Sequence, residues 1–420
     1  MARGQGKRLE VTVDALGARG DGIAQSGGER LYIGGALPGE RCLVQPGNKR
    51  GDGRAARLIE RLESSHVRRE PPCPHAARCG GCVLQHADPE LYAAWKRSNL
   101  IDTLARRGFD AEIVAPMESA PPGSRRRLRF ALARRDQHYM PAFRAAQSHD
   151  LVAIETCVVA DPALLDAAKQ LAAALGPHRV REIELTATKT GIDATAMADG
   201  DPPLALAERL GAIAEEAGLA RLAWKTPDLP AYVVAQANNP SLTFGAVTLP
   251  LPPGAFVQPT AWGEARIVSR VEPLLAGCVE VADLYAGCGA LGFALAAGRK
   301  LAMFEAVEAM TTAARTAARL HGLNITASSR DLDHQPLTGA ELERFDGVLL
   351  DPPRTGARAT CEALAVSRVA NIAYVSCHPG SFARDARILA DGGYVLERIW
   401  PIDQFLWSNH LELIAHFVAR

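Results

Sequence analysis

The second half of the chain is constrained most by an alternation of apolar, strand-like runs with helix-like stretches, which begins near residue 250. Strands that alternate with helices are typical of βαβ units and of a largely parallel sheet. We therefore expect residues 251–420 to form a doubly wound α/β domain. The pattern places strands at 279–284, 301–305, 345–350, 371–375 and 394–399, and helices at 290–297 and 309–320.

The first strand of this domain runs into a glycine-rich turn at residues 283–292, with a Gly-x-Gly step before the next helix. Such a turn lets the backbone approach a ligand at the helix N-terminus. Alone, it would suit NAD as well as S-adenosylmethionine, or serve only as a tight packing turn. Acids that end the next three strands, Glu305, Asp331 and Asp351, fit the S-adenosylmethionine layout of class I methyltransferases. Asp351 also opens an Asp-Pro-Pro-Arg turn that resembles the one with which methyltransferases grip planar nitrogen substrates.

Cys377 follows another apolar run, with Asp351 before it in the sequence and Glu412 after it. A thiol at a strand end, near one carboxylate that could hold a substrate and another that could take a proton, indicates covalent catalysis on an electrophilic ring. The simpler interpretation of one cysteine after a strand is a small, buried hydrophobic residue. The other motifs of the chain favour the catalytic interpretation.

Three cysteines fall within ten residues and a fourth lies far along the chain, namely Cys73, Cys79, Cys82 and Cys157. Soft thiolate ligands favour an iron–sulfur cluster or zinc. The spacing differs from the Cys-x3-Cys-x2-Cys of radical enzymes, and four protein ligands would leave no open iron position. We therefore expect a structural role. Zinc, with His75 or His86 in place of Cys157, is the alternative.

Short period-two runs with glycine and proline turns in residues 1–62 predict a small five-stranded barrel. Barrels of this size bind RNA, bind proteins or are structural. Residues 63–250 are expected to form an α+β central domain. Within it, seven arginines between residues 125 and 144 accompany one acid and three interleaved aromatic residues. That mixture suits phosphate contact and base stacking, although a solvated strand face would also explain it.

Composition limits the remaining possibilities. Lys plus Arg and Asp plus Glu both number 47 in the 420 residues, so a nucleic-acid site has to be a local patch. The first eight residues lack the apolar region of a signal peptide, and the longest charge-free stretch is broken by prolines. These features predict a cytoplasmic protein, whose nine cysteines serve as ligands or thiols rather than disulfides.

Several motifs together resemble one known family along most of the chain. The cysteine pattern, a Phe-x-Gln turn at residues 256–258 and the Ser-Cys-x-Pro stretch around Cys377 are similar to those of bacterial RNA (uracil-5-)-methyltransferases, specifically the branch that acts on 23S ribosomal RNA. The closing motif of that family matches at Asp403, Phe405, Ser408, His410 and Glu412.

The resemblance implies a TRAM barrel (OB-like) at residues 1–62, a central domain at 63–250 with a [4Fe–4S] cluster, and a class I methyltransferase domain at 251–420. It implies S-adenosylmethionine as the cofactor, 23S rRNA as the partner, 5-methyluridine as the product and a monomeric enzyme. The implied ligands of the cluster are Cys73, Cys79, Cys82 and Cys157.

The resemblance also implies catalytic roles. Cys377 would add to C6 of a flipped-out uracil, so that C5 becomes nucleophilic enough to take a methyl group. Glu412 would then remove the C5 proton. Gln258 and Asp351 would orient the uracil edge and border the cofactor. The cofactor pocket would be lined by Gln258, Tyr285, Ala290, Glu305, Asp331 and Asp351.

The chain departs from the family pattern at four places without losing a catalytic group. Ala290 replaces an Asn that contacts the cofactor in the family, so we expect weaker or rearranged cofactor binding. His378 and Thr260 also replace Asn, and Leu406 replaces a proline.

Three other functions compete with this prediction. The same reaction on transfer RNA is the nearest, but the bacterial tRNA enzymes generally lack the barrel and the cluster. A cytosine-5 or amino-methyltransferase is more distant, since an exocyclic-amine enzyme would not need Cys377. A non-catalytic iron–sulfur RNA-binding protein would follow if Ala290 had abolished cofactor binding.

Overall fold

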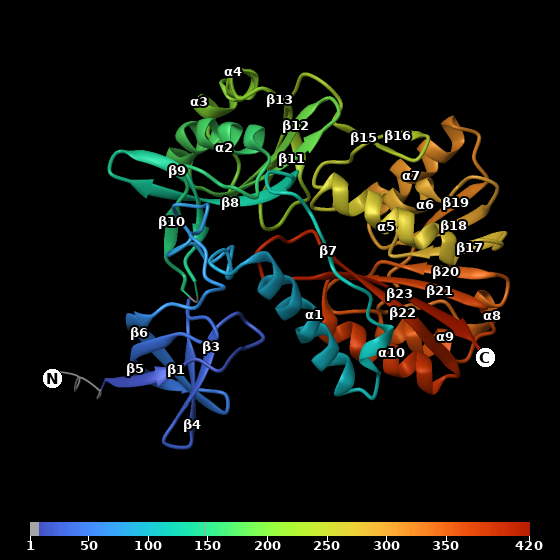
Figure 1. Ribbon diagram of the computed structural model, residues 1–420. Coiled ribbons are helices and arrows are strands. Elements are labelled where there is room, and N and C mark those ends of the chain that lie inside the picture. Colours follow the sequence, from blue (N-terminus) through green and yellow to red (C-terminus); the bar gives the residue numbers. More distant parts are fainter. Residues whose placement is uncertain (1–7, 147) are drawn as a thin grey trace. The chain divides into compact units, whose positions relative to one another are not determined.

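The computed structural model describes residues 8–146 and 148–420 (Figure 1). Residues 1–7, part of the segment that lacks a signal-peptide pattern, lie outside the described part. The chain divides into two compact units. This division does not test the predicted domain boundaries near residues 62 and 250, which remain predictions. Unit 1 comprises Met1–Asn99, Arg144–Val152 and Trp407–Asn409, and unit 2 comprises Leu100–Phe143, Ala153–Leu406 and His410–Arg420.

Within its described residues, unit 1 contains a six-stranded sheet in the order β1-β5-β6-β4-β3-β2. Neighbouring strands are antiparallel except for β4 and β6, which pair in parallel. Side chains such as Val11, Leu31 and Val44 gather in one apolar cluster. The short strands were predicted, although five were expected. Their bounds are β1 (Leu9–Thr12), β2 (Ala15–Leu16), β3 (Gly22–Ser26), β4 (Glu29–Ile33), β5 (Arg41–Arg50) and β6 (Gly53–Glu63).

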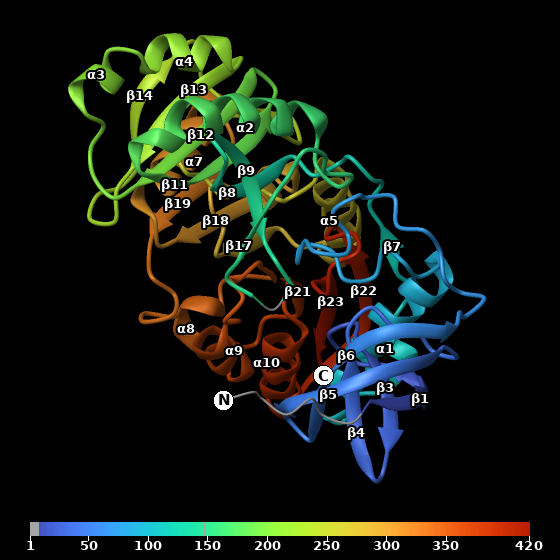
Figure 2. The ribbon, with the colours of Figure 1, turned by 90° about the vertical axis from the view of Figure 1, so that its left-hand side faces the viewer.

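The first sheet of unit 2 contains β9, β8, β11, β12, β13 and β14 in that order. Helices α2 (Pro162–Leu175) and α4 (Leu210–Glu216) pack over it (Figure 2). Its strands are β8 (Arg127–Arg135), β9 (His138–Arg144), β11 (Val180–Thr188), β12 (Gly191–Ala198), β13 (Leu219–Lys225) and β14 (Tyr232–Gln236). Short elements near it are η2 (Gly176–His178), α3 (Leu204–Ala207) and the hairpin of β15 (Ser241–Phe244) and β16 (Val247–Pro250). Three elements cross the division between the units, α1 (Pro89–Ala105), β9 and β10 (Leu151–Ala153).

The second sheet of unit 2 has the order β19-β18-β17-β20-β21-β23-β22-β7. Strands β17 to β21 are mutually parallel, whereas β23 runs antiparallel to both β21 and β22. The doubly wound α/β domain is therefore confirmed. Its strands are β17 (Glu280–Leu284), β18 (Lys300–Glu305), β19 (Ile325–Ser329), β20 (Gly347–Leu350), β21 (Asn371–Ser376), β22 (Tyr394–Asp403), β23 (Glu412–Ala419) and the short β7 (Glu118–Ser119).

Both faces of this sheet are buried, as is usual for parallel strands covered by helices. On β21, Ile372 and Tyr374 pack into the core with α9 and α10, whereas Ala373 and Val375 pack into the core with α5 and α6. The helices are α5 (Ala261–Leu274), α6 (Ala290–Ala294), α7 (Glu308–Leu320), α8 (Gly339–Leu342), α9 (Arg358–Ala365) and α10 (Pro379–Asp391), together with the turn η1 (Ala111–Ile113). Among the described residues, no helix is long and apolar enough to cross a membrane.

Candidate active site

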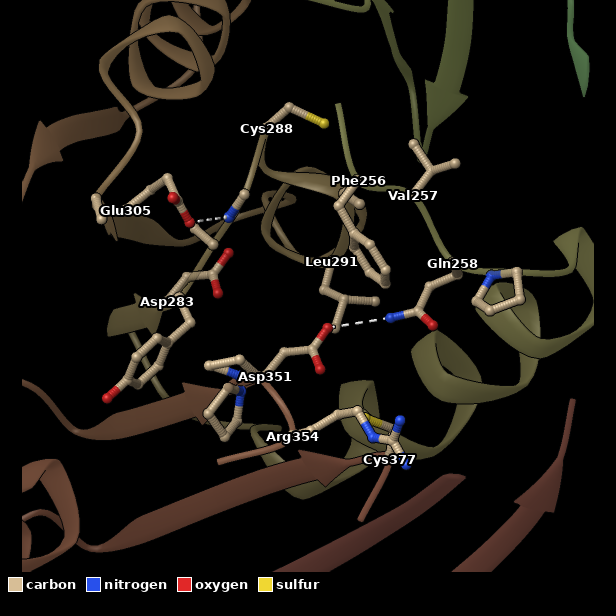
Figure 3. Close-up of a pocket in the computed structure, with 18 of the residues that line it drawn as sticks. Phe256, Val257, Gln258, Asp283, Cys288, Leu291, Glu305, Asp351, Arg354 and Cys377 are labelled. Atoms are coloured by element: carbon tan, nitrogen blue, oxygen red, sulfur yellow. Dashed lines mark hydrogen bonds between the residues drawn. The ribbon is translucent and has the colours of Figure 1, made fainter. Parts of the chain in front are cut away.

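A cavity of about 770 Å³ opens in unit 2, where β17, β18, β20 and β21 end (Figure 3). Its volume lies within the range of small-molecule and cofactor sites. The carboxyl ends of parallel strands meet at one edge of a sheet, and this common edge is why residues far apart in the sequence share the cavity. All eight side chains predicted for catalysis or cofactor binding line it, namely Gln258, Tyr285, Ala290, Glu305, Asp331, Asp351, Cys377 and Glu412.

The glycine-rich turn after β17 forms one wall of the cavity. Tyr285 has a φ of 65°, in the left-handed region that residues other than glycine rarely adopt. Gly289 has a φ of 89° and is the N-cap of α6, where a Cβ would collide with the ring of Phe293. Glu305 accepts a hydrogen bond from the backbone N–H of Gly287 at 3.0 Å (Figure 3). The acid at the end of β18 therefore holds the turn as well as facing the cavity.

Asp283, near the end of β17, is fully buried at the base of this turn. Among the described residues, its Oδ2 atom has no hydrogen-bond partner. Burial is the main cause that raises the pKa of this carboxyl to about 8, and the nearby Asp351 adds to the shift. A buried carboxyl with an unsatisfied oxygen is costly unless a cation or donor completes it, so this position suits a positively charged ligand group.

Two carboxyls and two amides form a chain of hydrogen bonds across the opposite wall. Gln258 Nε2 donates to Asp351 Oδ2 at 3.1 Å (Figure 3). Gln404 Nε2 donates both to Gln258 Oε1 and to Glu412 Oε2, each at 2.8 Å. Burial raises the pKa of Asp351 to about 7. Burial and the charge of Asp351 also raise the pKa of Glu412, against the lowering effect of the Gln404 hydrogen bond.

The thiol of Cys377 follows β21 and lines the same cavity (Figure 3). Burial is the largest cause that raises its pKa to about 12, with further contributions from the charges of Glu412 and Asp351. The guanidinium of Arg354 acts in the opposite direction. The resting thiol is therefore protonated at neutral pH, and a neighbouring cation would make it more reactive.

The mouth of the cavity combines cations with aromatic rings. The guanidinium of Arg127 lies 5.0 Å from the ring centroid of Phe256, whose surface is 55% exposed. Arg125 lies 5.6 Å from the ring of Phe405. Such pairs suit a nucleotide, because the cation contacts phosphate and the ring stacks on a base.

The remainder of the arginine run differs from what the sequence indicated. Arg126 is buried, pairs with Glu264 at 2.5 Å and donates to the carbonyl of Gln258 at 3.0 Å, so its role is structural. Arg127 and Arg129 pair with Glu184 on β11 at 2.8 and 2.9 Å. The stretch itself contains one acid, and the neighbouring strand β11 supplies another, Glu184, from a distant part of the sequence.

Two departures from the family pattern have a local explanation. His378 is the N-cap of α10, and its Nδ1 accepts a hydrogen bond from the N–H of Ser381 at 3.1 Å. Thr260 is the N-cap of α5, and its Oγ1 accepts from Gly263 N at 2.8 Å. Asn is favoured at N-caps because its side-chain oxygen accepts such a bond, and here His and Thr do the same.

Comparison with known proteins agrees with this geometry. The family model for tRNA (uracil-5-)-methyltransferases matches residues 251–418. The 23S rRNA (uracil(1939)-C(5))-methyltransferase RlmD of Chromohalobacter salexigens is 34% identical over 96% of this chain and 87% of its own length. The chain belongs to the RNA (uracil-5-)-methyltransferase family. It is an S-adenosylmethionine-dependent methyltransferase that acts on uracil C5 in RNA.

Further similarities cover nearly the whole methyltransferase. An uncharacterized RNA methyltransferase of Rhizobium meliloti is 37% identical over 96% of this chain and 98% of its own length. Among solved structures, the tRNA (uracil-54, C5)-methyltransferase of Pyrococcus abyssi in complex with S-adenosyl-L-homocysteine has a TM-score of 0.75, with 21% identity over 98% of this chain and all of that one. At this identity the likeness concerns the fold.

The cavity fits S-adenosylmethionine. The buried Oδ2 of Asp283 could accept a bond from the cofactor's ammonium group, and Glu305 ends β18 where a ribose can be held. Ala290 lines the cavity at the first residue of α6, but its side chain has no polar atom to offer. The Asn side chain that the family uses at this position is therefore absent, and the polar groups offered to the cofactor come from the other residues that line the cavity.

The four cysteines predicted for a cluster are distributed over both units. Cys73, Cys79 and Cys82 belong to unit 1, and Cys157 belongs to unit 2. The N–H of Gly81 donates to the Sγ of Cys79 at 3.5 Å. Within the described part of the chain, no group of three or more His, Cys, Asp or Glu side chains is arranged to hold a metal ion. The [4Fe–4S] site stays a prediction.

Two buried side chains of the site were given no role at the sequence level. Asp283 was visible as the first residue of the glycine-rich turn, but nothing in the pattern distinguished it from a packing residue. Gln404 follows Asp403 in the closing motif, and only the three-dimensional arrangement shows that it joins Glu412 to Gln258.

Proposed function

We propose that the methyltransferase converts a uridine of 23S rRNA to 5-methyluridine through a covalent bond between Cys377 and C6 of the base. The observation that carries this proposal is the sharing of one cavity by a thiol, two buried carboxyls and a glycine-rich turn. C5 of uracil is too weak a nucleophile to take the methyl group directly, and the addition of a thiolate at C6 is what activates it.

Cys377 is the proposed nucleophile. Its thiol has to lose a proton before it attacks, and the two neighbouring carboxyls oppose that loss. When bound, S-adenosylmethionine supplies the methyl group and a positively charged sulfonium. Arg354 supports the thiolate from the protein side.

Asp351 and Gln258 are proposed to hold the uracil edge. The Asp351 carboxylate can accept the N3–H of the base, and its bond to Gln258 Nε2 fixes its orientation. The backbone carbonyl of Gln258 accepts a hydrogen bond from Arg126 Nε. This arrangement makes the base-binding pair rigid before the RNA arrives, which reduces the cost of ordering it.

Glu412 is the proposed general base for the C5 proton. Its raised pKa places proton uptake closer to neutral pH than an ordinary glutamate would, which suits a group that accepts a proton and later releases it. The target base has to leave its stack to reach this depth, as in other base-modifying enzymes.

Ribosomal RNA is the proposed substrate because the relative from Chromohalobacter salexigens, whose printed name gives 23S rRNA as its substrate, resembles nearly the whole of this chain. The arginine–aromatic pairs at the mouth are proposed to contact the neighbouring nucleotides. Transfer RNA is the second candidate, since the matching family model is described by that substrate.

The test is methyl transfer in vitro with isotopically labelled S-adenosylmethionine and unmodified 23S rRNA or unmodified tRNA, followed by mass spectrometry of the nucleosides. We expect labelled 5-methyluridine from 23S rRNA alone. Label in tRNA alone would overturn the proposed substrate and keep the reaction. Label in neither RNA would overturn the proposed reaction and favour a non-catalytic RNA-binding protein whose cofactor site is defective at Ala290.

We also propose that Cys73, Cys79, Cys82 and Cys157 hold a [4Fe–4S] cluster of structural role, on the basis of their number, spacing and exposure. Protein purified without oxygen should contain about four iron atoms and absorb near the wavelengths typical of such clusters. Cys79→Ser should lose most of the iron, whereas Cys42→Ser, a buried thiol in the first sheet, should retain it. Zinc in place of iron in the metal analysis would contradict the proposal.

A further inference from the structure

Gln404 occupies a buried position between the two halves of the site. It lies at the turn after β22 and is 2% exposed. Its Nε2 atom donates to Glu412 Oε2 and to Gln258 Oε1, both at 2.8 Å. Gln258 in turn donates to Asp351 at 3.1 Å. Gln404 therefore links the carboxyl at the start of β23 with the pair that ends in Asp351.

The direction of these hydrogen bonds is fixed by the carboxyls at the two ends. An ionised carboxyl is only an acceptor, so in that state each glutamine turns its N–H groups towards its carboxyl. Gln404 then uses both of its amide hydrogens, and its Oε1 has no partner among the described residues. Leaving a buried carbonyl unsatisfied has a cost, which indicates that this orientation is imposed by the site.

Helix α5 holds the amide from its other side. Gly263 lies in the first turn of α5, and a Cβ at that position would collide with Oε1 and Cβ of Gln404. The close approach of a backbone to this amide leaves it little freedom to rotate. Gln404 is therefore pre-positioned rather than adjustable.

We propose that Gln404 is a positioning residue that keeps the Glu412 carboxyl oriented and ready to take the C5 proton. This inference rests on the proposed roles of Cys377 and Glu412. Gln404 is proposed to act in the last chemical step, the elimination, and to have no part in the attack of the thiol on C6.

In that step, the C5 proton passes to the Glu412 carboxylate and the C5–H electrons form the C5–C6 double bond. The bond between C6 and the sulfur of Cys377 breaks, and the thiolate leaves with its electron pair. A carboxyl that is already protonated cannot accept the proton, so the step requires Glu412 as the anion.

The charges around Glu412 work against that anion. Asp351 after β20 and Cys377 after β21 face it, and burial removes water from it. The hydrogen bond from Gln404 opposes these effects and lowers the pKa of Glu412. Without that bond, the pKa of Glu412 rises, and the pH below which turnover fails has to move upward.

The principal test is Gln404→Met, which keeps the shape and removes both hydrogen bonds. On ordinary RNA we expect kcat to fall roughly tenfold to a hundredfold, the range of a hydrogen bond to a charged group, with little change in KM for S-adenosylmethionine. The acidic limb of the kcat profile should move to higher pH, and protein–RNA adduct should accumulate. Gln404→Glu adds a carboxyl beside Glu412 and Asp351, and it should move the acidic limb of the kcat profile to still higher pH.

The matched control is Gln236→Met on β14, an exposed glutamine whose Nε2 donates to Asn239. It should behave as the wild type in every assay. Gly263→Ala is the second variant, because it displaces Gln404 while improving the helix locally. It should reproduce the slow elimination and the shift of the acidic limb to higher pH. Gly263→Ala therefore tests the role of Gln404 even if Gln404→Met does not fold.

RNA that contains 5-fluorouridine separates this inference from the proposed function. Such a base has no C5 proton, so the adduct should form at the same rate in the wild type and in Gln404→Met and then persist. The absence of an adduct in the wild type would overturn the covalent mechanism itself. A wild-type adduct together with unchanged kcat and pH profile in Gln404→Met would overturn only the role of Gln404. A slower adduct in Gln404→Met would also overturn that role, since Gln404 would then act before elimination.

Discussion

Replacement of Cys377 by alanine should abolish formation of 5-methyluridine, with a loss of roughly 10⁴-fold or more, the scale on which removal of a nucleophile acts in enzymes that form covalent intermediates. The thiol lines the cavity with Glu412 and Asp351, and the proposed mechanism uses no other nucleophile. The measurement is labelled methyl transfer to the RNA substrate, with the binding of S-adenosylmethionine determined separately by titration.

The matched control for this prediction is Cys278→Ala. Cys278 is a buried thiol that packs in the core with α5, and its replacement removes the same atom from the same unit. We expect a modest loss of stability and near-normal methyl transfer. Cys377→Ala should lose methyl transfer but still bind S-adenosylmethionine. Methyl transfer by Cys377→Ala at more than a few per cent of the wild-type rate would contradict the covalent mechanism.

The doubly wound domain was predictable because its strands are short, apolar and separated by helical periodicity, and the structure confirms them to within a few residues. The final strand β23 was not predicted, because it begins at Glu412, within a motif that indicates chemistry rather than a strand. Antiparallel insertion of β23 between β21 and β22 is a tertiary choice that no local pattern reveals.

The same distinction holds for the site. Strand ends can be recognised in a sequence, so Glu305, Asp351 and Cys377 could be assigned to one edge in advance. The bond from Gln404 to Gln258 joins residues 146 positions apart, and the pairing of Arg129 with Glu184 depends on the register of β8 and β11. Such contacts are set by packing between elements, and a pattern within one segment does not contain them.

Replacement of Glu412 by glutamine should leave the first chemical steps intact and block the last one. Glutamine keeps nearly the same shape and can still meet Gln404, but it cannot take up the C5 proton. Turnover should fall by about 10²- to 10⁴-fold, the range of general base catalysis, while a covalent complex between Cys377 and methylated RNA accumulates. The measurement is a gel shift that survives denaturation, with mass spectrometry of the cross-linked peptide.

The pH dependence gives a second consequence of the same assignment. Burial and Asp351 raise the pKa of Glu412, so the wild type should lose turnover as the pH falls through that raised value, because the protonated carboxyl cannot accept a proton. Over the same range the wild type should begin to accumulate adduct, and Glu412→Gln should show no such limb.

Glu397→Gln, at an exposed glutamate on β22 that pairs with His416, serves as the control and should keep the wild-type profile. If Glu412→Gln gave neither adduct nor altered pH profile, the base would have to be another group, and Asp351, which shares the cavity and has a pKa raised to about 7, would be the next to test.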